Sequence, residues 1–325
     1  MTAKSSRKLI LVTGGAGFIG SHIVEGLLDR GDAVRVLDNL STGKRENLEN
    51  LGDGRWKVHR DFEFIQGDIR DAAALDKSVA GVDAILHQAA LGSVPRSVED
   101  PATTQCVNAD GTLNIFWAAC KNQVSRVVYA SSSAVYGDSE ILPKREGTEG
   151  FPLSPYALTK KNNEEYGRLF KDLYNFETVG LRYFNVYGPR QDPESQYAAV
   201  IPRFISALLS GNQPVIYGSG LQSRDFTYVK DVVQANMLAL EAPLAACGEA
   251  YNIGRGDRAD LLALLDTLQS LLGTSIEAKF DPPRPGDVMH SSADTSRAAE
   301  RLGFKAVYDL RTGLGDSIEW YRNNL

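Results

Sequence analysis

The stretch "LILVTGGAGFIGSHIVEGLLDRG" at 9–31 constrains the fold more than any other part of the chain. A short apolar, β-branched run enters a glycine-rich turn, and apolar residues at helical spacing follow at once. The run "AVRVLD" at 33–38 then has the length and composition of a second strand. The N-terminus therefore predicts a strand, a tight turn, a helix and a returning strand.

The same alternation continues along the first half of the chain. Further strand-like runs occur at 63–68, 84–90, 126–133 and 178–186, with helix-period segments between them. Continuous apolar runs separated by helices are typical of strands buried on both faces, hence of a parallel sheet. We predict an α/β fold with a doubly wound parallel sheet.

Two departures from this pattern guide the expected organisation. Beyond residue 187, Gly and Pro become frequent and the runs shorten, so we expect a first domain at 1–187 and a smaller α/β lobe at 188–325. Some segments of the second part are expected to return to the first domain. The polar segment 40–62 predicts a long surface excursion.

Composition excludes several kinds of protein. The 325 residues carry a net charge of −6 without a run of like charges, which argues against nucleic acid or an anionic membrane as the main partner. The three cysteines are scattered, so neither a disulfide framework nor a metal site is expected. The N-terminal apolar run is too short for a signal peptide or a membrane span. We expect a cytoplasmic protein.

The glycine loop has the chemistry of an anion site. Gly14, Gly17 and Gly20 allow a tight turn and close approach of the backbone to a pyrophosphate, and the following helix presents its N–H groups. Asp38 ends the second strand, where a carboxylate accepts hydrogen bonds from ribose hydroxyls and repels a 2′-phosphate. Asn39 follows, without an adjacent arginine. This pattern predicts a dinucleotide site that takes NAD.

Two further strand ends belong to the expected site. Asp68, in "GDI", either lies near the adenine or caps the helix that begins at Asp71. Small residues in "HQAA" at 87–90 would let a cofactor lie close to Ala90. His87 in the same run fits a buried histidine better than a general base.

The stretch "SPYALTK" at 154–160 places Tyr156 and Lys160 on one face of a helix, one turn apart. A free phenol is too weakly acidic to serve as a base at neutral pH, but a nearby ammonium and an oxidised nicotinamide both favour the phenolate. A serine in "SSSAVYG", at the end of the fifth strand, would share the proton. The pattern indicates a serine–tyrosine–lysine site beside a dinucleotide.

Together these motifs resemble the extended short-chain dehydrogenase/reductases, and within them the UDP-hexose 4-epimerases. The resemblance runs through "TGGAGFIGSHIVEGLL", "DNLSTG", "GDIRD", "SSSAVYGD", "PLSPYALTK" and "LRYFNVYGPRQDP". It implies Ser132, Tyr156 and Lys160 as catalytic residues, in a Rossmann domain that binds NAD tightly and regenerates it in each cycle. The implied cofactor contacts add Phe18, Ile19, Gly43, Ile69, Ala89, Ala90, Asn108 and Tyr183, with Tyr156 and Lys160 shared.

The resemblance also separates reaction types. Nucleotide-sugar dehydratases of this family carry Asp-Glu after the catalytic threonine, whereas this chain has Ser133 and Ala134. Epimerisation needs only removal and return of the 4-OH proton and the C4 hydride. "HQAALGSVPRSVEDP" and "RQDPESQYAAVIPRF" are similar to epimerases that interconvert UDP-GlcNAc and UDP-GalNAc. In "RPGDVMHSSAD", a bulky tyrosine would narrow the sugar pocket, but this chain has Ser291, which leaves room for an acetamido group.

The remaining substrate contacts also come from the resemblance. They are Ser93, Ser132, Ser133, Asn185, Val200, Tyr217, Arg224, Arg284, Asp287 and Ser291, with Arg224 and Arg284 near the diphosphate and nucleotide. A homodimer is expected through the helices that begin near Pro101 and Pro155, with Phe116, Trp117 and Phe170 on the shared face. The alternatives are a UDP-glucose 4-epimerase proper, a UDP-glucuronate epimerase or decarboxylase, and a non-catalytic dinucleotide sensor.

Overall fold

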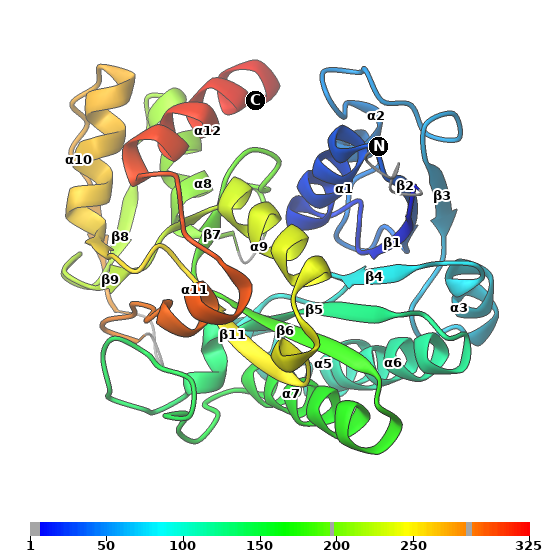
Figure 1. The fold of residues 1–325 in the computed structure, drawn as a ribbon. Coiled ribbons are helices and arrows are strands. Elements are labelled where there is room, and N and C mark those ends of the chain that lie inside the picture. The colour runs from blue at the N-terminus through cyan, green and yellow to red at the C-terminus, as the bar shows by residue number, and fades with distance from the viewer. Residues whose placement is uncertain (1–6, 196–197, 284–287) are drawn as a thin grey trace.

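A computed structural model describes residues 7–195, 198–283 and 288–325. In this part of the chain, seven parallel strands form the central sheet in the order β11-β6-β5-β4-β1-β2-β3 (Figure 1). Their bounds are β1 Leu9–Thr13, β2 Ala33–Asp38, β3 Glu63–Gln66, β4 Ala84–His87, β5 Arg126–Ser132, β6 Glu177–Tyr183 and β11 Glu249–Ile253. The predicted doubly wound parallel sheet is confirmed.

Helices cover both faces of this sheet (Figure 1). One face carries α3 (Ala72–Val79), α6 (Gly111–Lys121) and α7 (Pro155–Tyr174). The other carries α1 (Phe18–Arg30) and α9 (Val229–Glu241), with α11 (Ser296–Leu302) packed on β11 and α9. Shorter helical segments are α2 Glu46–Glu49, α4 Val94–Glu99, α5 Pro101–Gln105, η1 Cys106–Asp110, η2 Ser133–Tyr136 and η3 Leu244–Ala246.

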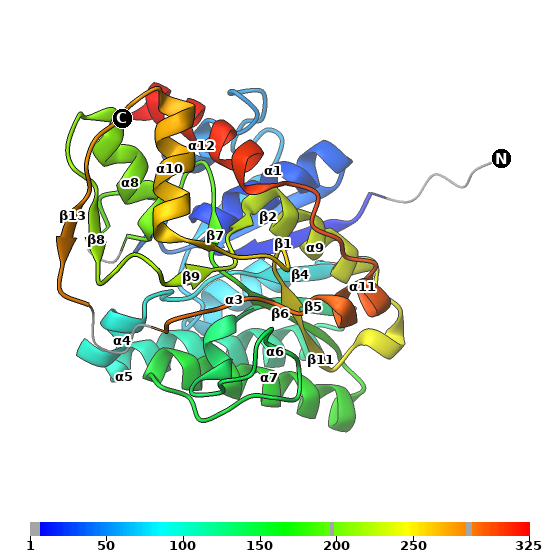
Figure 2. The same cartoon turned by 90° about the vertical axis from the view of Figure 1, so that its left-hand side faces the viewer.

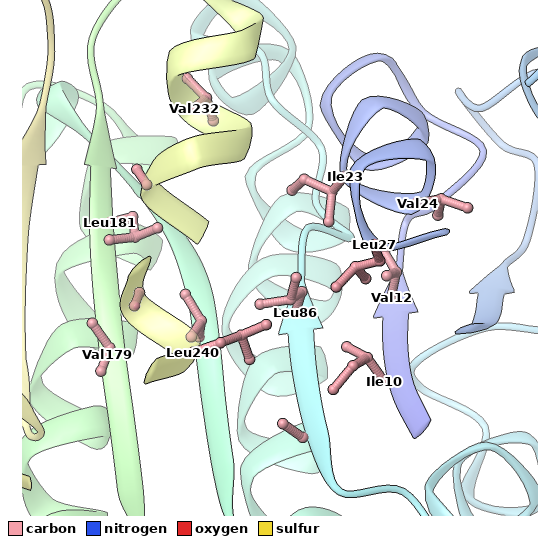
Figure 3. Packing of buried hydrophobic residues seen from close by; sticks show 14 of the residues in the cluster. Ile10, Val12, Ile23, Val24, Leu27, Leu86, Val179, Leu181, Val232 and Leu240 are labelled. Atoms are coloured by element: carbon pink, nitrogen blue, oxygen red, sulfur yellow. The ribbon is translucent and has the colours of Figure 1, made fainter. Parts of the chain in front are cut away.

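The alternation of side chains along β1 explains why the sheet has a core on each side. Ile10 and Val12 point to the face covered by α1 and α9, where Leu27 and Val232 join them (Figure 3). Leu11 points to the opposite face and packs in a second cluster with α3, α6 and α7. Because both faces are covered, the strand reads as a continuous apolar run in the sequence.

A second lobe packs its own core beyond the carboxyl end of the sheet. Figure 2 shows α8 (Val200–Leu209), α10 (Leu261–Leu272) and α12 (Leu310–Asn324) together on one side of the molecule. Short strands complete it: β7 Val186–Tyr187, β8 Val215–Tyr217, β9 Ser223–Arg224, β10 Thr227–Tyr228, β12 Ala259–Asp260 and β13 Lys279–Asp281. The chain returns to the first unit twice. It does so at α9 and β11, after β10, and again at α11, after β13.

Two expectations about the surface need correction. Segment 40–62 is not wholly a surface excursion, because two of its own residues, Leu48 and Leu51, are fully buried in the core on the α1 face of the sheet. Phe116 and Phe170 do not line an outer face: both are buried in the core beneath α6 and α7, whereas Trp117 is 46% exposed. Among the described residues, no helix is both long and apolar enough to cross a bilayer, and the cytoplasmic location stays a prediction.

Candidate active site

A cavity of about 480 Å³ opens at the carboxyl edge of the sheet. Its wall contains the glycine loop after β1 and residues from the ends of β2, β4, β5 and β6. Ligands of doubly wound folds bind at this edge, because the strand ends and the helix N-termini meet there. The cavity therefore gathers segments that are distant in the sequence.

The glycine loop makes a turn that side chains would block. Gly14 has φ +69°, and a Cβ there would lie 2.7 Å from the amide nitrogen of Ala89. A Cβ on Gly20 would lie 2.1 Å from the Gly14 carbonyl oxygen. Helix α1 begins directly after Gly17 without a side-chain cap. Its first N–H groups are thus available at the cavity wall, where they favour an anion.

Two carboxylates line the cavity on the other side of this loop. Asp38 is only 7% exposed and accepts hydrogen bonds from the amides of Ala16 and Leu40, at 2.9 and 2.8 Å. Burial raises the pKa of Asp38, and these amides oppose the rise. Asp68 accepts from Asn39 at 2.8 Å and from both ends of the Arg70 guanidinium, which hold the pKa of Asp68 well below its ordinary value.

Helix α7 presents the tyrosine and lysine to the same cavity. Ser154 caps its start by accepting from the amide of Ala157 at 3.1 Å, Pro155 fills the first turn, and Asn175 ends it in a left-handed conformation. Tyr156 and Lys160 both line the cavity. The Lys160 nitrogen lies 5.9 Å from the centre of the Tyr156 ring.

The electrostatics of this pair are set by burial. Burial raises the pKa of Tyr156, and a hydrogen bond with the Ser132 side chain opposes the rise. Burial also lowers the pKa of Lys160 to about 8, against the opposing charge of Glu164. Lys160 donates to the Ala130 carbonyl at 2.7 Å, which holds the ammonium beneath the end of β5. Ser132, at that strand end, accepts from the amide of Ala134 at 3.1 Å.

Comparisons with known proteins decide the family. The model of the NAD dependent epimerase/dehydratase family matches residues 10–254. The chain belongs to this family. A UDP-glucose 4-epimerase from Mycolicibacterium smegmatis is 38% identical over 320 residues, covering 96% of this chain and 98% of the relative.

Two solved structures extend the comparison to the whole fold. The UDP-N-acetylglucosamine 4-epimerase from Methanobrevibacter ruminantium M1, in complex with UDP-N-acetylmuramic acid, has a TM-score of 0.92 and 41% identity, covering 99% of this chain and 100% of its own. The UDP-glucose 4-epimerase from Thermus thermophilus, in complex with NAD, has a TM-score of 0.86 and 36% identity, covering 98% and 100%. The cofactor of this family is NAD.

Most of the site residues expected from the sequence line the cavity described above. They are Gly14, Gly17, Phe18, Ile19, Gly20, Asp38, Asn39, Asp68, Ile69, Ala89, Ala90, Ser132, Ser133, Tyr156, Lys160, Tyr183 and Asn185. Asp68 does not cap α3: that role belongs to Asp71, which accepts from the amide of Ala73 at 2.9 Å. Of the two interpretations of Asp68, the structure retains the one that places it in the cavity.

Three expected contacts lie outside the cavity wall. The Asn108 amide exchanges hydrogen bonds with the backbone of Leu91, at 2.8 and 3.1 Å, so it orders the wall from behind. Ser93 caps α4 by accepting from the amide of Arg96 at 3.2 Å. Gly43 packs against the glycine loop, where a Cβ would meet Ala16 at 2.9 Å. Each residue supports the site, but the structure does not give it a place on the cavity surface.

The expected substrate contacts of the second lobe also lie beyond this cavity. Tyr217 ends β8 beneath Arg203, whose guanidinium carbon lies 5.6 Å from the tyrosine ring centre, and Val200 begins α8. The amide of Ser291 donates to the carbonyl of Ser223 at 3.0 Å, which sets Ser291 beside the strand that carries Arg224. Arg284 and Asp287 lie outside the described residues.

His87 is buried between two hydroxyls. Its Nδ1 lies 2.6 Å from Thr13 Oγ1 and its Nε2 lies 3.0 Å from Thr112 Oγ1. Burial, followed by the charge of Lys160, lowers the pKa of His87 to about 3. The side chain is therefore neutral at physiological pH and is not among the residues of the cavity wall, which agrees with a structural role.

One hydrogen-bonded group at the cavity was not expected from the sequence. Gln88 accepts from the Tyr183 hydroxyl at 3.1 Å and donates to Asn236 at 3.2 Å, while Asn236 donates back to Tyr183 at 2.9 Å. Gln88 and Tyr183 line the cavity, and Asn236 comes from α9. A polar residue directly after β4 was the available signal for Gln88, but nothing local marked Asn236.

Proposed function

We propose that this protein is a UDP-sugar 4-epimerase that interconverts UDP-GlcNAc and UDP-GalNAc, with UDP-glucose and UDP-galactose as a second pair. The observation that carries the proposal is that the glycine loop and the set Ser132, Tyr156 and Lys160 form one cavity. Relatives that share the whole chain with it are named as 4-epimerases of UDP-sugars. A non-catalytic sensor would not need a base and its cation beside the cofactor.

The cavity has the donor set that a dinucleotide needs. The start of α1, with Gly14, Gly17 and Gly20, would hold the pyrophosphate, and Asp38 would hold the adenosine ribose. Asn39 and Asp68 would border the adenine. Bound there, NAD would supply the acceptor for the hydride of C4 and the donor that gives it back. Because the cofactor leaves the cycle unchanged, we expect it to stay with the protein.

The chain's own residues handle the proton. Tyr156 would take the proton of the 4-OH and return it after the 4-keto sugar has turned over. Lys160 favours the phenolate through its charge, and Ser132 shares a hydrogen bond with the same phenol. Ser133 and Ala134 stand where a dehydratase would carry its acidic pair, so these two positions offer no carboxylate to drive loss of water.

The sugar preference rests on the loop that contains Ser291. The Ser291 amide donates a hydrogen bond to the carbonyl of Ser223. Ser223 is next to Arg224, which would pair with the diphosphate. Ser291 and Ser292 are both small, which leaves space for an acetamido group. The named UDP-GlcNAc relative supports this choice, and the UDP-glucose relatives support the second sugar pair.

We also propose a homodimer through the outer face of α6 and α7. Large apolar side chains are exposed there at helical spacing, namely Trp117, Leu158, Tyr166, Leu169 and Leu173. A Leu169→Arg variant is expected to run as a monomer in light scattering. If it keeps the dimer mass of the wild type, this face is not the interface.

The test of substrate is a rate comparison. The purified protein is incubated without added cofactor with UDP-GlcNAc and, separately, with UDP-glucose, and products are resolved by NMR. Faster formation of UDP-GalNAc than of UDP-galactose supports the proposal. Turnover of UDP-glucose alone would leave the epimerase chemistry and refute the acetamido preference. Turnover of UDP-glucuronate alone, as its epimer or with release of CO₂, would refute the proposed substrate class.

A further inference from the structure

A buried ionic cluster lies directly behind the proposed catalytic residues. The Arg182 guanidinium, on β6, donates to both oxygens of Glu164 on α7, at 2.9 and 2.7 Å. Its remaining nitrogen binds Glu149 and, at 3.0 Å, the Tyr136 hydroxyl. The side chains of Arg182 and Glu164 are 7% and 11% exposed. Such a pair is costly to desolvate, so its place beside the site suggests a function other than stability.

The cluster acts on the site in two ways. Ser131, the neighbour of Ser132 on β5, donates to Glu164 at 2.5 Å, so the carboxylate fixes the strand end that carries the catalytic serine. Glu164 also follows Lys160 by one helical turn on the same face of α7, and its charge opposes the effect of burial on the ammonium. Both effects, one hydrogen bond and one charge, come from one carboxylate.

We infer that Glu164 is a positioning residue of the epimerase: held by Arg182, it keeps Lys160 charged and fixes the end of β5 beside Tyr156. The inference rests on the proposed roles of Tyr156 and Lys160. Arg182 is essential to the arrangement, because its guanidinium pairs with both oxygens of Glu164 and offsets the cost of burying that charge.

The other groups around the pair do not replace Glu164. Lys160 faces Tyr156 on its own helix, the Ala130 carbonyl on β5 and His87 on β4, and of these only Tyr156 becomes negative, as the phenolate that the ammonium must favour. Around the carboxylate lie, besides Arg182 and Ser131, the Tyr129 phenol on β5 and Glu165 on α7. The charge of Glu165 acts on Tyr129, whereas the charge that acts on Lys160 is that of Glu164. Glu149 reaches the cluster only through Arg182.

Glu149 gives a matched control. Glu149→Gln and Glu164→Gln each remove one carboxylate partner of Arg182, but only Glu164→Gln removes the charge one turn from Lys160. The readout is kcat/KM of the holoenzyme against pH with UDP-GlcNAc or UDP-glucose, whichever is turned over. Its alkaline limb reports loss of the Lys160 proton in the free enzyme. Tyr156→Phe and thermal unfolding are measured alongside.

We expect Glu164→Gln to move the alkaline limb to lower pH by roughly one unit, while Glu149→Gln leaves it at the wild-type position. If Glu164→Gln does not fold, the double variant Glu164→Gln/Arg182→Met removes both buried charges together, which cores tolerate better, and the same displacement is expected. Limbs that coincide with the wild type, or equal displacements in both single variants, would overturn the inference. An active Tyr156→Phe variant would overturn the proposed catalytic roles and the inference with them. An inactive Tyr156→Phe together with unmoved limbs would overturn the inference alone.

Discussion

The ammonium of Lys160 lies 5.9 Å from the centre of the Tyr156 ring and is anchored to the Ala130 carbonyl at 2.7 Å. The anchor comes from β5, the strand that ends in Ser132. Helix α7 and strand β5 therefore fix the three side chains relative to one another before any ligand binds. Lysine favours the phenolate only while it is charged. The pair therefore works when Lys160 holds its proton and Tyr156 has lost its own.

Replacing Tyr156 by Phe removes the proposed base and leaves the helix intact. We expect the epimerisation rate to fall by about 10² to 10⁴-fold, the range typical of a lost general base, with an unchanged melting temperature. Tyr166→Phe, at an exposed tyrosine of the same helix, is the control and should keep the wild-type rate. Equal rates for the two variants would remove Tyr156 from the mechanism.

His87 makes the stability of the fold sensitive to acid. Its pKa is about 3 in the folded state against about 6.5 in the unfolded chain, so the unfolded state alone binds a proton between these values. The stability from neutral His87 is therefore present above about pH 6.5 and is lost as pH falls toward 3. Compared with His87→Gln, the wild type should lose up to about 1.4 kcal/mol more unfolding free energy per pH unit in this window. Parallel urea-unfolding curves at pH 7, 6 and 5 would contradict this.

Asp225 joins three segments of the second lobe around Arg224. Its fully buried carboxylate accepts from the amides of Arg255, Gly256 and Ala293, at 2.8, 3.0 and 3.0 Å. Asp225→Asn would leave buried N–H groups facing an amide, at a cost of about 1–3 kcal/mol. Since Ala293 belongs to the loop of Ser291, KM should rise about tenfold, equivalent to about 1.4 kcal/mol, with little change in kcat.

A second buried aspartate separates this effect from simple destabilisation. Asp231, on α9, accepts from the amides of Val307 and Tyr308, and within the described part of the chain its hydrogen bonds do not reach the Ser291 loop. Asp231→Asn is expected to lower the melting temperature while KM stays at the wild-type value. A similar rise of KM in both variants would show that Asp225 has no particular role in substrate binding.

The size of the side chain at 291 should govern sugar choice. Ser291→Tyr is expected to lower the rate with UDP-GlcNAc at least tenfold relative to UDP-glucose, because a filled pocket has no space for the acetamido group. Ser292→Tyr is the matched control, because it adds the same bulk one residue away from the proposed pocket wall at Ser291. Ser291 is the correct position only if the two variants differ in their relative rates with UDP-GlcNAc and UDP-glucose. If Ser291→Tyr lowers both rates equally, the pocket argument is refuted.

The parts of the site that were predictable from the sequence are local in the chain. The glycine loop needs small residues at fixed spacing between a strand and a helix, and Tyr156 and Lys160 are one turn apart behind a capping serine. Such signals are formed by residues that are close together in the sequence, so they can be recognised before the fold is known.

The parts that were missed depend on contacts between distant segments. Glu164 looks like a residue of a solvated helix face until β6 brings Arg182 against it. Asn236 lies far along the chain from Gln88 and joins it only because α9 returns to the first unit. Ser93 shows a related difficulty, because a serine that caps a helix and one that binds a sugar have the same appearance in a sequence, and its sugar contact stays a prediction.

The proposed 4-epimerisation is tested most directly by following a label through one turnover. The wild-type protein, without added cofactor, is given UDP-GlcNAc deuterated at C4, and the product is examined by NMR. We expect UDP-GalNAc that retains deuterium at C4, because the same hydrogen leaves and returns within the cavity. A product that has exchanged the label with solvent, or one that has lost water from the sugar, would contradict it.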